Sequence, residues 1–103
     1  MTGYEYLDMY YALYRSDGWD TGELTNRQVA AAEIDALIWW GYANMTFDHY
    51  REGLIDPESW AENSRHFRLF LKLPVYRAVY DKWWSRTPSE FTHLIDKMIE
   101  NDA

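Results

Sequence analysis

The sequence contains no cysteine among its 103 residues. This absence excludes disulfide bonds, zinc–thiolate and iron–sulfur sites, and a cysteine nucleophile. No run approaches the roughly 18 apolar residues that are needed to cross a bilayer. Residues 1–5 carry neither the basic start nor the apolar stretch of a secretory signal. We therefore expect a cytoplasmic protein whose fold is held together by packing alone.

Basic residues are scarce in the first half of the chain. Residues 1–50 contain eight acidic residues against Arg15 and Arg27, whereas residues 51–103 contain nine acidic and eight basic residues. Binding to a phosphate backbone requires Lys and Arg, so we expect no direct contact with nucleic acid and none with membrane. The acidic excess favours either a basic protein partner or a solvated acidic surface.

Except for Gly41, the few proline and glycine residues fall near the ends of expected helices or in the loops between them. Capping boxes are predicted at Thr2–Glu5, Thr25–Gln28 and Thr87–Glu90. Gly53 fits a helix C-cap, and Pro57 and Pro74 fit first helical positions. Without any strand signal, the sequence predicts an all-α fold. We expect one domain over residues 1–103, a compact bundle of four to five helices with a long second helix that ends at Arg51.

Apolar residues within these helices recur at the spacing of a helix face. In the long second helix, the repeat consists of Ala30, Ile34, Leu37, Ile38, Gly41, Met45 and His49. In the fourth helix, Val75, Val79 and Trp83 form the apolar side. The aromatic residues predicted to fill the core are Trp60, Phe67, Phe70, Trp83 and Phe91.

Aromatic residues are in excess, with nine Tyr, six Trp and four Phe. Trp39 and Trp40 project about 100° apart on a helix, so one of them is expected to leave the core. Tyr and Trp dominate the energetics of protein interfaces. The predicted interface anchors are Tyr6, Tyr10, Tyr14, Trp19 and Trp40. The acidic residues predicted to steer a basic partner are Asp8, Asp17, Asp20, Glu23 and Asp35.

These features predict a small acidic protein-binding module rather than an enzyme, with no catalytic residue, metal or cofactor. One version is an inhibitor that presents carboxylates in place of phosphates to a nucleic-acid-handling protein. Phage-encoded blockers of bacterial defence are of this size and charge, which is an analogy of class and not of motif. A second version is an accessory domain that forms a homodimer through exposed aromatic residues.

Two further alternatives place chemistry in a pocket or on a basic stripe. A ligand or enzymatic pocket between helices would use Glu90 and His93, which have the Glu-x-x-His spacing of helical metal sites. A basic stripe of Arg65, Arg68 and Lys72, beside Tyr76 and Tyr80, would hold phosphate or an acidic partner. It could equally be a solvated helix face.

Residues 38–99 resemble a helical module found in uncharacterised bacterial proteins. Its recurring pattern is G-L-I-D…W…P-x-x-R…W-W…S-x-E-F. The matching residues are Gly53-Leu54-Ile55-Asp56, Trp60, Pro74, Arg77, Trp83-Trp84 and Ser89-Glu90-Phe91. Val75 departs from the pattern, which usually has glycine after the proline. The resemblance implies a helical fold and no particular activity.

Overall fold

The computed structural model describes residues 3–4 and 24–102, and every regular element in these ranges is helical. The elements are α2 (Asn26–Arg51), α3 (Pro57–Leu71), α4 (Pro74–Val79), the π-helix η1 (Tyr80–Trp84) and α5 (Glu90–Asp102). The all-α prediction is confirmed for the described residues, which form four α-helices and one π-helix. The predicted first helix lies almost wholly outside the described residues. The longest helix is therefore the first of the described chain, and its predicted place as the second is not matched.

The ends of α2 are fixed by the signals that the sequence predicts. At its start, the Gln28 N–H donates to the Thr25 hydroxyl at 3.1 Å, and the Thr25 N–H donates to the Gln28 side chain at 2.8 Å. At its end, Gly53 adopts a positive φ of 80°. The Leu54 N–H then reaches the His49 carbonyl and the Gly53 N–H the Tyr50 carbonyl. This is the Schellman arrangement, which satisfies carbonyls of the last helical turn.

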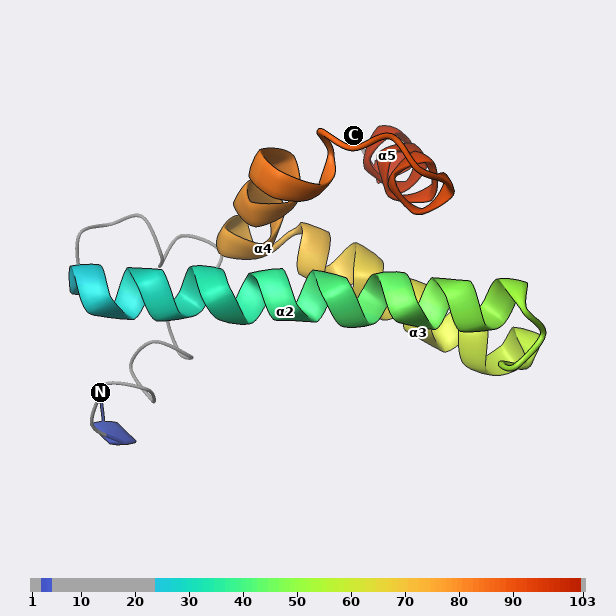
Figure 1. The fold of residues 1–103 in the computed structure, drawn as a ribbon, viewed down its shortest axis with the longest axis horizontal. Coiled ribbons are helices and arrows are strands. Elements are labelled where there is room, and N and C mark those ends of the chain that lie inside the picture. The colour runs from blue at the N-terminus through green and yellow to red at the C-terminus, as the bar shows by residue number, and fades with distance from the viewer. Residues whose placement is uncertain (1–2, 5–23, 103) are drawn as a thin grey trace.

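Helix α2 provides the long axis of the molecule (Figure 1). Its 26 residues span about 39 Å, close to the longest dimension of 41 Å. Helix α3 runs back beside α2 after a tight turn, and α4 packs against both of them. Helix α5 is seen nearly end-on in Figure 1 and packs against α3.

The core is built on the face of α2 opposite to the one that we predicted. Ala32, Ala36 and Trp40 have no exposed surface, and Ala43 is 3 % exposed. By contrast, Ile34, Leu37, Ile38 and Met45 of the predicted face are exposed. Both faces are apolar, so periodicity alone does not choose between them. The alanine face is buried because small side chains leave room for the aromatic residues of the other helices.

The buried face of the fourth helix also differs from the predicted one. Val75 and Val79 are buried as expected, but Trp83 is 55 % exposed, and Trp84 packs on Phe91 instead. The cause is the π-helix η1, in which the Ser85 N–H bonds the Tyr80 carbonyl five residues earlier. The wider turn contains one extra residue, so the core side of the helix moves from position 83 to position 84. The prediction of Trp83 as a core residue is wrong.

This phase shift makes the two neighbouring tryptophans respond differently to substitution. Trp84→Ala is expected to lower the free energy of unfolding by about 2 kcal/mol, because a half-buried ring is lost from the core. Trp83→Ala should change it by less than about 0.5 kcal/mol. Urea denaturation of the two variants, compared with the wild type, measures the difference. Equal losses, or a larger loss at position 83, would show that the helix keeps the ordinary α period.

Helix α5 begins later than its predicted capping box. The Thr92 N–H donates to the Ser89 hydroxyl at 3.1 Å, and the Ser89 N–H donates to the Thr92 hydroxyl at 2.8 Å. Ser89 and Thr92 therefore perform the reciprocal capping that we predicted for Thr87 and Glu90. Glu90 instead pairs with Arg51 at the end of α2, at 2.8 Å.

Two of the other predicted core aromatics, Phe67 and Phe91, are buried, and Trp60 and Phe70 pack partly buried against them.

Candidate functional site

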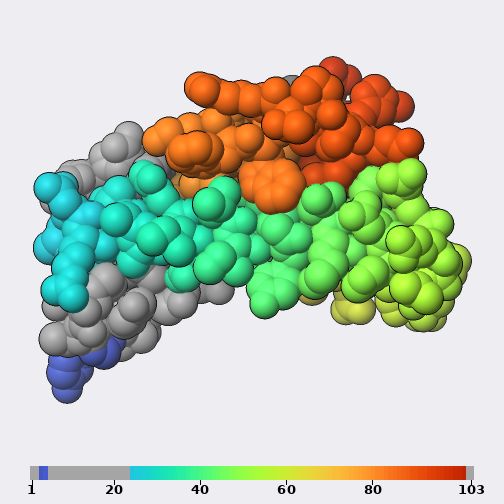
Figure 2. Space-filling view, viewed as in Figure 1, coloured from blue at the N-terminus to red at the C-terminus, as the bar shows by residue number. Residues whose placement is uncertain are grey.

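The most unusual surface of the described molecule is the outer face of α2, formed by Ile34, Leu37, Ile38, Tyr42 and Met45. Each of these side chains is at least 41 % exposed. Gly41 lies among them, and a methyl group added there would meet nothing within 4 Å. Figure 2 shows α2, from cyan to green, crossing the visible side of the molecule without cover from α3, α4 or α5. A contiguous apolar stripe of this kind marks an interaction site more often than scattered apolar residues do.

Helix α2 is therefore apolar on two opposite faces, and among the described helices only one of these faces is packed against a neighbour. A helix that is apolar all round is normally buried on all sides. The stripe is bounded by exposed charges, Arg27 toward the start of the helix and Asp48 toward its end. The sequence contained a signal for this surface, because the alanine face and the isoleucine face both repeat at three and four residues. We assigned the second repeat to the core and so missed it as a surface.

Trp83 extends the apolar surface beyond α2. It lines a hollow of about 370 Å³ together with Leu37 and Asn44 of α2 and with Trp84, Thr87 and Ser89. The Lys82 ammonium lies 5.3 Å from the centre of the Trp83 ring, so one part of this exposed ring carries a cation–π contact. Leu37 thus belongs both to the outer face and to the wall of the hollow.

The structure tests few of the predicted binding residues. Eight of them lie outside the described residues: Tyr6, Tyr10, Tyr14, Trp19, Asp8, Asp17, Asp20 and Glu23. Asp35 is half-buried on α2. Trp40 has no exposed surface, so its prediction as an interface anchor is wrong.

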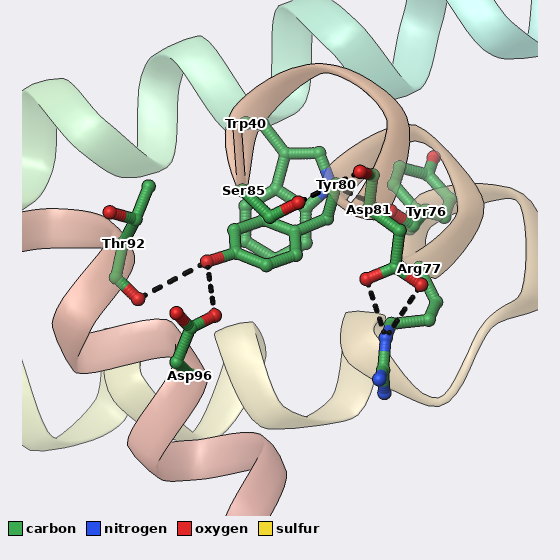
Figure 3. A network of polar contacts seen from close by, with 8 residues as sticks. All are labelled: Trp40, Tyr76, Arg77, Tyr80, Asp81, Ser85, Thr92 and Asp96. Carbon is green, nitrogen blue, oxygen red and sulfur yellow. Dashed lines mark hydrogen bonds and ion pairs between the residues drawn. The ribbon is translucent and has the colours of Figure 1, made fainter. Parts of the chain in front are cut away.

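Trp40 is instead the centre of the core (Figure 3). Its Nε1 donates to the Tyr76 carbonyl of α4 at 2.8 Å. Its ring lies 4.9 Å from Trp39, 5.1 Å from Tyr80 and 6.3 Å from Phe91, measured between ring centres. The expectation that one of the two adjacent tryptophans leaves the core is met in part by Trp39, which is partly buried and stacks on Phe70 at 4.3 Å.

Glu90 and His93 line an open hollow of about 660 Å³ with Phe47, Pro88, Ser89, Leu94 and Lys97. The Glu90 carboxylate is exposed and paired with Arg51, and His93 is exposed as well. General acid–base groups usually owe their tuned pKa values to burial or to a close charged neighbour in a cleft. Among the described residues, no three His, Asp or Glu side chains gather as a metal site would require.

The basic stripe lacks the aromatic partners that we predicted for it. Arg65, Arg68 and Lys72 are exposed on α3 and at its end. However, Tyr76 is 7 % exposed and Tyr80 has no exposed surface, so both rings face the core. A stacking platform beside these cations is therefore not formed by the two tyrosines.

A buried polar network ties α5 to η1 (Figure 3). The Tyr80 hydroxyl donates to Asp96 Oδ1 at 2.8 Å and lies 3.2 Å from the Thr92 carbonyl. Burial, reinforced by the hydrogen bond to Asp96, raises the pKa of the Tyr80 hydroxyl well above its ordinary value of 10. The folded state therefore favours the protonated phenol, which identifies Tyr80 as a structural donor.

This network predicts a loss of stability in alkali. The stabilisation from Tyr80 is complete below its unfolded pKa of about 10 and is lost as the pH rises toward its higher folded pKa. Tyr80→Phe is expected to cost about 1–2 kcal/mol at neutral pH, because Asp96 and Thr92 lose a donor. It should also reduce the decline in stability above pH 10. Thermal denaturation from pH 7 to 11 measures both, and an unchanged alkaline slope in the variant would contradict the assignment.

None of the described helices is long and apolar enough to cross a membrane. No protein-family model, curated protein or solved structure shows a significant match to this chain. The resemblance of residues 38–99 to a bacterial helical module therefore remains an expectation.

Proposed function

We propose that this chain is a protein-binding module whose main binding surface is the outer face of α2. The observation that carries the proposal is the position of that face, opposite to the buried face made by Ala32, Ala36 and Trp40. Apolar residues on the solvent side of a helix add nothing to the fold. They do supply binding energy when a partner covers them.

The apolar side chains of this face can contribute substantially to the free energy of binding. Full burial of an Ile, Leu or Met side chain is worth about 1.5–3 kcal/mol relative to its exposure to water. Ile34, Ile38 and Met45 are each about half exposed, so a partner would bury a large part of each. Asn44, Asp35 and Glu33 border the stripe and would supply the polar rim that is typical of protein interfaces.

The charge of the chain favours a basic protein as any partner other than a second copy of this chain. Residues 5–23 contain five of the 17 acidic residues and one basic residue, Arg15. An excess of acidic residues accelerates association with a basic protein. The inhibitor that mimics nucleic acid and the cytoplasmic location both remain predictions from the sequence.

A charge placed on the outer face tests the proposal. Ile38→Glu should abolish association with any partner of this face, because the carboxylate would have to lose its hydration in an apolar contact. The fold should remain intact, since Ile38 is 53 % exposed. The matched control is Leu69→Glu, which makes the same change at a 55 % exposed position on α3.

Both variants are compared with the wild type for partner capture from lysate and for the mass of the purified protein in solution. The proposal expects Ile38→Glu to lose a species that the wild type and Leu69→Glu retain, with all three melting at similar temperatures. If the three proteins bind the same species equally well, the outer face of α2 is not a binding surface.

A further inference from the structure

Resting on the proposed function, we infer that the protein on the outer face of α2 is a second copy of this chain. The two α2 helices pack antiparallel about a two-fold axis between Leu37 and Ile38. In such an arrangement, a residue of one helix faces a residue of the other helix when their two residue numbers add up to 75. An antiparallel pair with this symmetry presents the same patch on both subunits.

The shapes of the side chains are complementary in this register. Ile34 faces Gly41, and Gly41 has open space above it in the single chain. Ala30 faces Met45, so a small residue again meets a large one, and both are exposed. At the axis, Leu37 of each copy faces Ile38 of the other. Close packing of two helices requires that large side chains of one helix enter the gaps above small residues of the other.

The charges are complementary in the same register. Arg27 and Asp48, the exposed charges that bound the stripe, face each other across the interface, and the symmetry forms this pair twice. A parallel arrangement in register would instead place Arg27 on Arg27 and Asp48 on Asp48, which is unfavourable. The Arg27–Asp48 pair therefore favours this antiparallel register over the parallel arrangement in register.

Trp83 lies beside this contact. It shares a hollow with Leu37, which stands at the inferred axis, and with Asn44. Its exposed ring is thus placed to widen the contact between two copies beyond the two helices. A pair of helices alone provides a narrow interface, and stable interfaces usually bury more than about 1,200 Å² in total.

Reversal of the two charges tests the direction and register directly. Arg27→Asp and Asp48→Arg should each raise the dissociation constant of the dimer about tenfold or more, because each creates two like-charge contacts. An equimolar mixture of the two variants forms a heterodimer in which both facing pairs again have opposite charges. Its dissociation constant should return to within about threefold of the wild-type value, and this rescue should weaken in high salt.

Sedimentation equilibrium over a range of concentrations measures these constants on the full chain. The matched controls are Arg65→Asp and Glu62→Arg on α3, which change the net charge equally at exposed positions away from the face. They should leave the dissociation constant unchanged, alone or mixed. Ile38→Glu should abolish the dimer.

Two results would overturn the inference. A wild-type chain that stays monomeric at all accessible concentrations excludes the second copy as the partner. A dimer that responds to the charge reversals no more than to the controls, and that mixing does not rescue, is formed elsewhere or in another register. The proposed function is decided separately, because a different partner captured by the wild type and lost in Ile38→Glu would uphold it while the homodimer fails.

Discussion

Replacing Trp40 with alanine is expected to lower the free energy of unfolding by about 3–5 kcal/mol, the range for removal of a large aromatic side chain from a core. The side chain is completely buried and contacts α4, η1 and α5. Domains of this size are stable by about 5–15 kcal/mol in total. The loss is therefore a large fraction of the total stability, and the melting temperature of the variant should fall by several degrees or more.

Two other substitutions separate the causes of this loss. Trp40→Phe keeps most of the ring contacts but removes the Nε1 donor to the Tyr76 carbonyl, which also accepts the Tyr80 N–H. It should cost about 1–2 kcal/mol. Trp83→Ala removes the same side chain as Trp40→Ala from an exposed position and should be nearly neutral. Urea denaturation at one fixed protein concentration compares all three. If Trp40→Ala resembled Trp83→Ala, the described core would be wrong.

The second large effect is expected from Phe91→Ala. The Phe91 ring joins α5 to three other elements, because it lies 5.9 Å from Phe47 of α2, 6.4 Å from Phe67 of α3 and 5.9 Å from Trp84 of η1. Its loss should cost about 3–5 kcal/mol and should weaken the attachment of α5 before that of the other helices.

Hydrogen–deuterium exchange tests the location of this effect. In Phe91→Ala, the amides of α5 should exchange much faster than in the wild type, while those in the centre of α2 remain comparatively protected. His93→Ala, an exposed neighbour on the same helix, provides the control and should leave exchange unchanged. If amide exchange in Phe91→Ala were accelerated equally in all helices, α5 would not unfold separately from the rest of the described chain.

The helix ends could be predicted from the sequence because each depends on a few neighbouring residues. The Thr25–Gln28 capping box, the Gly53 turn and the Asp56-Pro57 start are all present as predicted. Where two local capping signals compete, the sequence alone did not show which residues cap the helix. Ser89 and Thr92 cap α5 in place of Thr87 and Glu90, so the helix begins later than predicted.

Which face of each helix is buried could not be predicted, because the buried face depends on the elements that pack against the helix. Helix α2 has two apolar faces, and the choice of the alanine face follows from the bulk of Trp40, Phe67 and Tyr80. The single π turn in η1 places Trp84 in the core and Trp83 at the surface, and no local pattern in the sequence predicts this turn. The candidate binding surface was missed for the same reason, because the sequence does not show which of the two apolar faces is covered.

The measurement that tests the central claim most directly is photo-crosslinking from the outer face of α2. A photoreactive phenylalanine analogue is introduced in place of Ile38 in one protein and in place of Leu69 in another, and both are irradiated in cell extract and as purified chains. We expect a defined crosslinked product from position 38, either to a second copy or to another protein, and only background from position 69. Equal background from both positions would contradict the claim that this face binds a protein.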